Sequence, residues 1–506
     1  MAEGPLDVLV VGGGITGAGL LLAAARRGLR ALLVEGGDFA SGTSSRSGKL
    51  VHGGMRYLAH LRVGLTRTLL RERDRLLRDH PGLVDPMEFV LPTYRHRPKD
   101  RLSFAVAVRA YDLLRGRGRS WTRYRPEEIL RRYPGLTATG LDGGFGYADA
   151  VTDDARMVLR TLREARRSGG HALNYVRAGE LVREGGRVDG AELLDGVSGR
   201  SVVVRARRVL NATGAQADGL RGQVGAPPRL RPVRGTHLVF PREVLPFATA
   251  VSVRHPADDR YIYLVPWEGA TLVGTTDLDD PRRDGGEPRP TPGEVAYLLE
   301  ALAAWFPGTP ADRHHLVAAF AGVRPIVDSG SGDPYSAGRE SVLWDEQGLV
   351  TVISGKLTGF QAIVEKALHK LPSDGGGRRE PEDRGAAPAD GLAELDPGVR
   401  TRLLGRYGPD ASSLVAAAGP GEMEPVGDTG FLWAEVRWGA RGEGVRHLDD
   451  LLLRRARVGV LLPGGGAAHL PRVREICRQE LGWDDARWRA EEARYRSLWS
   501  QAYAVP

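Results

Sequence analysis

The stretch that most constrains the fold of this 506-residue chain is DVLVVGGGITGAGLLLAAARRGLRALLVE, near its start. The apolar run at residues 8–11 predicts a parallel strand that is buried on both faces. Gly12, Gly14 and Gly17 then give the spacing G-x-G-x-x-G, which allows a sharp turn, close approach of a pyrophosphate and packing of a helix on the strand. Glu35 ends the second strand, where its carboxylate can accept hydrogen bonds from a ribose. The pattern predicts a dinucleotide-binding βαβ unit.

The next segment, GDFASGTSSRSGKLVHGGMRYL, has neither strand nor helix periodicity. A purely connecting loop of this length is unusual, which favours a functional loop. The chain carries no second fingerprint for NAD. We therefore predict FAD bound in an extended form, with this loop running from the ribose back toward the flavin ring.

Strand and helix patterns alternate farther along. VLNATG predicts a second turn close to the dinucleotide, and YIYLVPW and ATLVGTT predict two antiparallel strands joined at Glu268 and Gly269. We predict an α/β fold: a Rossmann-like FAD-binding domain, an inserted and mainly antiparallel substrate domain, and a C-terminal all-helical domain. The expected boundaries are 1–371 for the oxidoreductase region (substrate segments roughly 75–150 and 225–330), 372–391 for a flexible linker and 392–506 for the helical domain.

Composition excludes several classes of protein. With Cys477 as its one cysteine, the chain has no internal disulfide, zinc–thiolate site or iron–sulfur cluster. No apolar run reaches the ~18–20 residues of a membrane-spanning helix. The N-terminus has no basic region of a secretory signal, so a cytoplasmic location is expected.

The positive charge is concentrated in one segment. Residues 95–125 contain ten basic and two acidic residues, a surplus equal to the net charge of +8 of the whole chain. Within it, RLSFAVAVRAYDLL predicts an amphipathic helix, which suits an anionic membrane surface. A solvated helix with a charged outer face is an equal alternative. Nucleic-acid binding is less favoured, because no reader module accompanies the charge.

The whole stretch GGGITGAGLLLAAARRGLRALLVEGGDFASGTSSRSGKLVHGGMRYL resembles the amino-terminal signature of the FAD-dependent glycerol-3-phosphate dehydrogenases. GFGYADAVTDDARMVL, NATG, RGTHLVFP, VGTTD, AGVRP and SGKLT follow in the family's order, and LDDLLLRRARVG resembles its helical cap domain. The resemblance implies oxidation of sn-glycerol 3-phosphate to dihydroxyacetone phosphate. It implies transfer of the electrons to a quinone at the inner face of the membrane, where the enzyme would be peripheral, or to oxygen in the oxidase branch.

The resemblance also implies roles for individual residues. Arg56, Arg324 and Lys356 would bind the substrate's phosphate, with Tyr57 beside them. His52 and His237 are candidate catalytic groups: His52 would approach the flavin, and His237 would take the hydroxyl proton. Arg324 would also stabilise the developing alkoxide. The residues expected to contact FAD are Gly12, Gly14, Ile15, Thr16, Gly17, Glu35, Thr43, Ser44, Ser45, Lys49, Leu50, His52, Gly53, Ala212, Thr213, Gly214, Gly322, Gly355, Lys356, Leu357 and Thr358. No metal site is expected.

Several positions depart from the family pattern. Gly359-Phe360-Gln361 stands where Thr-Tyr-Arg is usual, Glu340 and Ser341 replace other residues, and Gln216 replaces a tryptophan. Another small polyol phosphate or a hydroxy acid is therefore an alternative substrate. A membrane-docked flavoprotein with little turnover is a non-enzyme alternative, which the intact His52, Arg56, Arg324 and Lys356 disfavour. The sequence leaves the electron acceptor and the assembly, including a homodimer, open.

Overall fold

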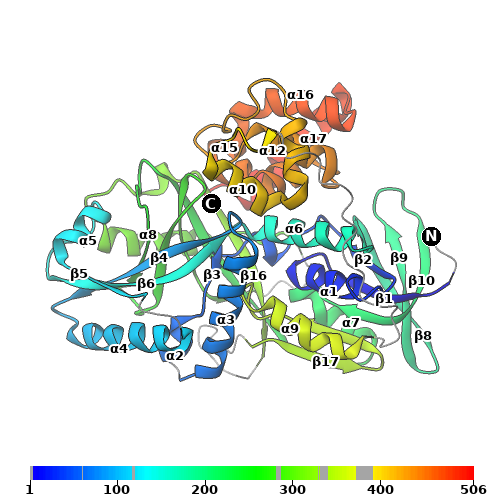
Figure 1. Cartoon of the computed structure of the whole chain (residues 1–506), viewed down its shortest axis with the longest axis horizontal. Coiled ribbons are helices and arrows are strands. Elements are labelled where there is room, and N and C mark those ends of the chain that lie inside the picture. Colours follow the sequence, from blue (N-terminus) through cyan, green and yellow to red (C-terminus); the bar gives the residue numbers. More distant parts are fainter. Residues whose placement is uncertain are drawn as a thin grey trace.

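A computed structural model describes residues 4–59, 61–116, 120–280, 286–328, 330, 340–371 and 391–506 (Figure 1). Two sheets lie next to each other, and the C-terminal helices pack over the region between them. The predicted linker at 372–391 lies outside the described residues except for Gly391. Arg117 and Arg119 of the basic segment, and the side chain of Arg56, also lie outside them.

The first sheet is the predicted Rossmann-like sheet. Its first strand, β1 (Leu6–Val11), pairs in parallel with β2 and β10, and β10 pairs in parallel with β18. The spatial order is β17 (Val342–Glu346), β18 (Leu349–Ile353), β10 (Ser201–Asn211), β1, β2 (Ala31–Glu35) and β7 (His171–Asn174). The antiparallel pair β8 (Val176–Glu184) and β9 (Arg187–Asp195) extends from β10. The strand predicted at residues 8–11 is thus confirmed.

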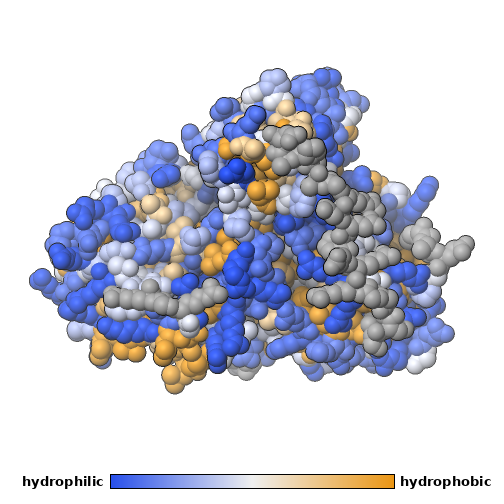
Figure 2. Space-filling model, viewed as in Figure 1, coloured by the Kyte–Doolittle hydropathy of each residue, from blue (hydrophilic) through white to orange (hydrophobic). Residues whose placement is uncertain are grey.

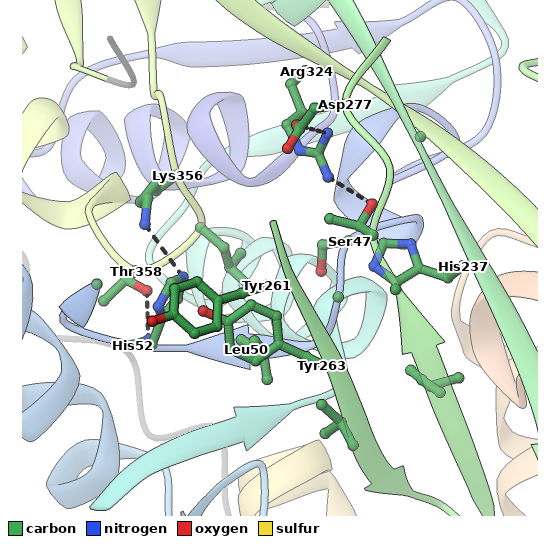
Figure 3. A pocket seen from close by; sticks show the side chains of 18 of the residues that line it. Ser47, Leu50, His52, His237, Tyr261, Tyr263, Asp277, Arg324, Lys356 and Thr358 are labelled. Atoms are coloured by element: carbon green, nitrogen blue, oxygen red, sulfur yellow. Dashed lines mark hydrogen bonds and ion pairs between the residues drawn. The ribbon is translucent and has the colours of Figure 1, made fainter. Parts of the chain in front are cut away.

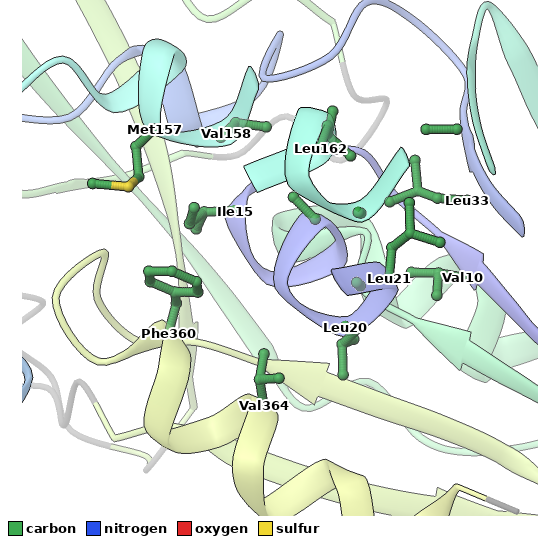
Figure 4. Packing of buried hydrophobic residues seen from close by; sticks show 14 of the residues in the cluster. Val10, Ile15, Leu20, Leu21, Leu33, Met157, Val158, Leu162, Phe360 and Val364 are labelled. Carbon is green, nitrogen blue, oxygen red and sulfur yellow. The ribbon is translucent and has the colours of Figure 1, made fainter. Parts of the chain in front are cut away.

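Helices cover the first sheet and form its core with it. These are α1 (Ile15–Ala25), α6 (Asp154–Arg167), α7 (Ala217–Gln223) and α9 (Phe360–Ala367). In Figure 4, Leu20 and Leu21 of α1 lie between Val10 and Leu33 of the strands and the side chains of α6 and α9. Both leucines are fully buried, and such burial stabilises a fold by about 1.5–3 kcal/mol per side chain. The α1 helix is therefore fixed against the sheet that carries the glycine turn.

The second sheet is mainly antiparallel, as predicted for the substrate domain. Its order is β15 (Leu278–Asp279), β11 (Leu230–Pro241), β14 (Ala270–Gly274), β13 (Tyr261–Trp267), β12 (Ala250–Arg254), β4 (Val84–Tyr94), β6 (Leu141–Thr152) and β3 (Leu50–Val51). β16 (Ala318–Val327) also pairs with β11, and β5 (Thr122–Tyr124) pairs with β6. The antiparallel pair predicted at 261–267 and 270–276 is confirmed, with the second strand ending at Gly274.

The helices that pack with the second sheet include the predicted amphipathic helix. They are α2 (Met55–Ala59), α3 (Val63–Asp79), α4 (Pro98–Arg115), α5 (Pro126–Arg132) and α8 (Pro292–Trp305). The amphipathic helix is α4, and it buries Phe104, Val108 and Tyr111. In the described part of the chain, no helix combines the length and apolar character needed to span a membrane.

The C-terminal region is helical, as predicted. Its elements include α10 (Pro397–Tyr407), α11 (Ala411–Ala416), α12 (Trp433–Gly442), α13 (Leu448–Asp450), the π-helical turn η7 (Leu451–Arg455), α14 (Val458–Leu461), α15 (Pro463–Gly466), α16 (Leu470–Leu481) and α17 (Asp485–Ala502). Its apolar side chains share one core with Val239, Leu272 and Phe320 of the second sheet. The helical region is therefore packed on the oxidoreductase region rather than separate from it.

Candidate active site

The glycine turn after β1 leaves no room for a side chain at Gly12 or at Gly17. A Cβ atom on Gly12 would lie 2.5 Å from the carbonyl oxygen of Ala212, and one on Gly17 would lie 1.9 Å from the carbonyl oxygen of Gly12. Gly12 also has a φ of +113°, which favours glycine. The predicted turn at Ala212, Thr213 and Gly214 thus contacts the fingerprint, and the amide of Ala212 donates to Val11.

Glu35 and Ser44 flank the start of α1. The Glu35 carboxylate accepts hydrogen bonds from the amides of Gly13 (2.7 Å) and Gly37 (2.8 Å), and burial raises the pKa of Glu35. The Ser44 hydroxyl accepts from the amide of Ile15 (3.1 Å), in the first turn of the helix. A glycine N-cap at the start of a helix and a carboxylate at the end of the second strand fit the pyrophosphate and ribose of a dinucleotide.

Beyond this turn lies a cavity of about 200 Å³ between the two sheets. Figure 3 shows Arg324, Lys356, His52, His237, Tyr261 and Tyr263 around it. The predicted residues that line the cavity are Thr43, Leu50, His52, Tyr57, His237, Gly322, Arg324, Gly355, Lys356, Leu357 and Thr358. Three cations (Arg46, Arg324 and Lys356) and several polar groups around one cavity suit a small anionic ligand.

Arg324, on β16, is oriented by an acid and a hydroxyl from the segment between β14 and β15. Its Nη1 donates to Asp277 Oδ1 (2.8 Å) and its Nη2 donates to Thr275 Oγ1 (3.0 Å). Gly235 on β11 leaves the space that the guanidinium occupies, since a Cβ there would lie 2.3 Å from Nη2. About 20% of the Arg324 side chain is exposed, so it can meet a ligand while it stays fixed.

His237 is a buried, neutral imidazole at the cavity wall. Its ring stacks on Phe320 with centroids 5.1 Å apart. Burial, together with the nearby charges of Arg324 and Lys49, holds the pKa of His237 well below its usual range. Its Nδ1 has no hydrogen-bond partner among the described residues. A neutral imidazole in this place can accept a proton from a bound ligand.

His52 and Lys356 contact each other on one side of the cavity (Figure 3). The Lys356 Nζ lies 3.2 Å from His52 Nε2 and 4.0 Å from the centroid of the Tyr57 ring. The amide of His52 donates to the Thr358 hydroxyl (3.0 Å), and the next amide, of Gly53, donates to Asp149 (3.3 Å). The side chains of Thr358 and Asp149 therefore hold the backbone at His52 and Gly53 in place.

Some predicted cofactor residues face away from the cavity. The Lys49 side chain is fully buried, and its Nζ donates to Asp154 (2.8 Å) and to the carbonyl of Ser45 (2.7 Å). Burial lowers the pKa of Lys49 to about 7, aided by the charge of Arg457. Gly53 packs against Tyr111 and Leu70. The structure thus gives Lys49 and Gly53 contacts that shape the loop.

The positions that depart from the family pattern lie outside the lining of the cavity, as far as the chain is described. Phe360 is 4% exposed and packs near Ile15 in the core under α1 (Figure 4). Glu340 pairs with Arg62 (3.3 Å), and Gln216 is exposed. The changes at these three positions therefore leave the lining of the cavity unaltered.

Sequence reasoning missed several lining residues, notably Arg46, Ser47, Tyr147, Tyr261, Tyr263 and Asp277. The period of two along YIYLVPW could have indicated the tyrosines, because Tyr261, Tyr263 and Val265 share the cavity face of β13 while Ile262 and Leu264 are buried in the core. No comparable pattern in the sequence indicates Asp277, because the pairing of distant strands in the sheet is what brings it to Arg324.

The site and fold define a nucleotide-dependent oxidoreductase, and comparison with known proteins agrees. Residues 7–362 match the family described as FAD dependent oxidoreductase, and residues 362–488 match the C-terminal domain of alpha-glycerophosphate oxidase. The chain is 34% identical to glycerol-3-phosphate dehydrogenase 2 of Mycobacterium bovis, over 97% of this chain and 87% of the relative. It is 31% identical to the aerobic glycerol-3-phosphate dehydrogenase of Staphylococcus epidermidis, over 89% and 86%.

A solved structure agrees over the full length. The glycerol-3-phosphate dehydrogenase of Bacillus halodurans complexed with FAD superposes with a TM-score of 0.75 at 26% identity, covering 99% of this chain and 96% of that chain. The chain therefore belongs to the FAD-dependent oxidoreductases and, among them, to the glycerol-3-phosphate dehydrogenase family. The predicted family, fold class and FAD cofactor are thereby confirmed.

Proposed function

We propose that this chain oxidises sn-glycerol 3-phosphate to dihydroxyacetone phosphate. The observation that carries the proposal is the placement of Arg324 and Lys356 with a neutral His237 around one small cavity beside the glycine turn. When bound, FAD supplies a hydride acceptor at its N5 atom. The relatives' names and the full-length match to the Bacillus halodurans structure support the same substrate.

The residues that line the cavity would have separate roles, which follow from the chemistry of their side chains. Arg324 and Lys356 would hold the phosphate through charge-assisted hydrogen bonds, with Tyr57 beneath Lys356. His237 would accept the proton of the substrate hydroxyl while the hydride leaves the same carbon. Arg324, fixed by Asp277, would stabilise the alkoxide that develops between these two transfers. His52 would be held by Lys356 near the flavin ring.

Anaerobic mixing of the purified FAD-loaded protein with sn-glycerol 3-phosphate tests the proposal. Bleaching of the flavin absorbance with stoichiometric release of dihydroxyacetone phosphate is expected. Bleaching by a small hydroxy acid or by another polyol phosphate, with no bleaching by glycerol 3-phosphate, would favour the alternative substrates. Bleaching by none of these compounds would favour a flavoprotein that does not turn over.

The low pKa of His237 predicts an unusual pH profile. A base must be deprotonated to act, and this pKa is shifted downward by burial and by Arg324 and Lys49. The acidic limb of kcat/KM should therefore lie well below 6.5, the ordinary value for histidine. Stopped-flow flavin reduction across pH measures it. In His237→Asn the limb should vanish and the rate fall about 100-fold; an unchanged limb would show that another group is the base.

We further propose that electrons pass to a quinone at an anionic membrane, with α4 as the docking helix and the enzyme peripheral on the cytoplasmic side. Figure 2 shows hydrophobic surface gathered over α4 and α2. Leu102, Val106 and Leu113 share one face of α4 and are 71%, 57% and 82% exposed. Leu61, between α2 and α3, is 85% exposed. An apolar helical face beside basic residues suits a lipid surface.

The charge of the segment contributes less than its sequence count suggests. Arg97 pairs with Asp259 (2.6 Å), Arg101 with Asp142 (2.9 Å) and Arg115 with Asp74 (3.5 Å). These pairs neutralise part of the surplus, so docking would rest mainly on apolar insertion and resist salt. The sequence-based prediction combines electrostatic attraction with apolar insertion, and these ion pairs shift the balance toward the apolar part.

Replacement of Leu102, Val106 and Leu113 together by serine should abolish vesicle binding. Each buried side chain is worth about 1.5–3 kcal/mol, so the partition coefficient should fall more than about 100-fold. Co-sedimentation with phosphatidylglycerol vesicles measures this. The matched control replaces Val197, Val202 and Val203, which are 64%, 45% and 55% exposed near the β9–β10 turn. Absence of wild-type binding to these vesicles would favour the solvated helix and a soluble acceptor such as oxygen.

A further inference from the structure

The C-terminal region inserts three arginines against the loop that follows the second strand of the nucleotide fingerprint. Arg454 and Arg455 end the η7 turn, Arg457 follows it, and their side chains are 3%, 0% and 1% exposed. A buried charge is strongly unfavourable unless it is paired and hydrogen-bonded. Each of the three has a partner in residues 36–49, hereafter the FAD loop. Within the helical region, Arg454 also pairs with Asp449 (2.8 Å) and Asp450 (2.6 Å), and Arg457 pairs with Asp154 (3.3 Å) at the start of α6.

Arg454 and Arg455 hold the start of the FAD loop through Asp38. Arg455 Nη2 donates to Asp38 Oδ1 (2.8 Å), and both arginines also contact Oδ2. Although burial opposes it, the charges of Arg455 and Arg454 lower the pKa of Asp38 to about 2. Asp38 directly follows Gly37, whose amide holds the carboxylate of Glu35. The pair therefore fixes the turn that positions the acid expected at the ribose.

Arg457 holds the other end of the FAD loop. Its Nη2 donates to the carbonyl of Ser45 (2.7 Å), which also accepts from Lys49 Nζ (2.7 Å). The hydroxyl of the preceding residue, Ser44, accepts a hydrogen bond from the amide of Ile15 at the start of α1. A Cβ atom on Gly14 would lie 3.1 Å from the same Ser44 hydroxyl. Adjacent residues thus contact the pyrophosphate end of the fingerprint and the C-terminal region.

A third contact to the FAD loop comes from the residue that follows α17. Tyr503, just after α17, places its hydroxyl 3.2 Å from Arg46 Nε and 3.1 Å from Arg46 Nη2. Arg46 in turn donates to the carbonyl of Ser41 (2.6 Å). The loop is therefore held at Asp38, Ser45 and Arg46 by elements more than 400 residues away in the chain.

We propose that the C-terminal helical region is a positioning clamp for FAD. Arg454 and Arg455 act through Asp38, Arg457 acts through Ser45, and together they keep the FAD loop in the shape that receives the ribose and pyrophosphate. Docking of the region and binding of FAD then favour each other, because each orders the same loop. This role concerns cofactor binding and does not depend on the substrate. The clamp can therefore be tested separately from glycerol 3-phosphate oxidation.

Flavin titration of the apoprotein tests the clamp. Arg455→Gln and Arg457→Gln should weaken FAD binding at least about tenfold, measured by quenching of flavin fluorescence. Arg457→Lys, which keeps a donor for the Ser45 carbonyl, should restore most of the affinity. The control is Arg441→Gln, which loses a pair with Glu480 inside the helical region. Folded glutamine variants that bind FAD within twofold of the wild type would overturn the proposal.

Hydrogen exchange of the unmodified protein gives a second test that does not depend on variants folding. FAD added to the apoprotein should slow amide exchange in residues 448–458 as well as in the FAD loop, by at least about threefold. A helical region that only packs on the outside would exchange at the same rate with and without FAD. Protection confined to the FAD loop and the glycine turn would therefore overturn the clamp.

Discussion

Arg324→Ala is expected to slow flavin reduction by sn-glycerol 3-phosphate by about 10- to 150-fold. Charge-assisted hydrogen bonds are worth about 1.5–3 kcal/mol each, and about 1.4 kcal/mol corresponds to a tenfold change in rate. Arg324 would contact both the phosphate and the developing alkoxide, so the loss should appear in kcat as well as in KM. Stopped-flow reduction at several substrate concentrations separates the two parameters.

The structure supplies controls for this prediction. Asp277 is 5% exposed and would lose its ion pair with Arg324 in Arg324→Ala, so part of the loss would come from this change at a buried acid. The double variant Arg324→Ala with Asp277→Asn removes that contribution. Glycerol, which lacks the phosphate, should be a poor substrate for the wild type and lose much less in the variant. Arg313→Ala, at an exposed position, should change nothing. Equal losses with both substrates would show that Arg324 does not bind the phosphate.

The nucleotide half of the fold was predictable because its signals are local. The buried strands at β1 and β2, the glycine spacing and Glu35 lie within about thirty residues, and each has a direct steric or hydrogen-bonding reason. The β13–β14 hairpin was predictable for the same reason, since a short turn joins two strands with the right periodicity. In such segments, the residues that form the sequence pattern also make the contacts in the folded protein.

The cavity was less predictable, because its walls meet only through long-range pairing. Arg324 on β16 reaches Asp277, which follows β14, because both strands pair with β11. Lys49 illustrates the opposite case: it lies in the right loop, but its side chain extends into the interior toward Asp154. Sequence position identified the loop, whereas the contact with α6 decided which way the Lys49 side chain faces.

The burial of the C-terminal arginines was likewise not predictable from the local sequence. LLRRARV has the charge pattern of a solvated helix, yet the structure buries Arg454, Arg455 and Arg457. Their partners, Asp38, Ser45 and Asp154, are about 300 or more residues earlier in the chain. Only the docked arrangement of the helical region shows that these charges are paired.

Gly14→Val is expected to yield a folded protein that contains no FAD. The Cβ of residue 14 meets only the Ser44 hydroxyl, at 3.1 Å, so the protein itself needs a small adjustment. The backbone there is extended, with φ −81° and ψ −174°, which valine can adopt. The side chain would instead occupy the space through which a pyrophosphate approaches the start of α1.

Substitution of Gly17 provides a comparison that tests the reason given for the Gly14→Val prediction. A Cβ on Gly17 would lie 1.9 Å from the carbonyl oxygen of Gly12, so Gly17→Val should disrupt the βαβ unit itself. Gly222→Ala, with nothing near its Cβ, is the tolerated control. Flavin released on denaturation and thermal unfolding of the apoprotein are the two measurements. Gly14→Val should lose the flavin but keep the unfolding transition, and Gly17→Val should lose both. Retention of FAD by Gly14→Val would mean that the pyrophosphate does not lie against the glycine turn.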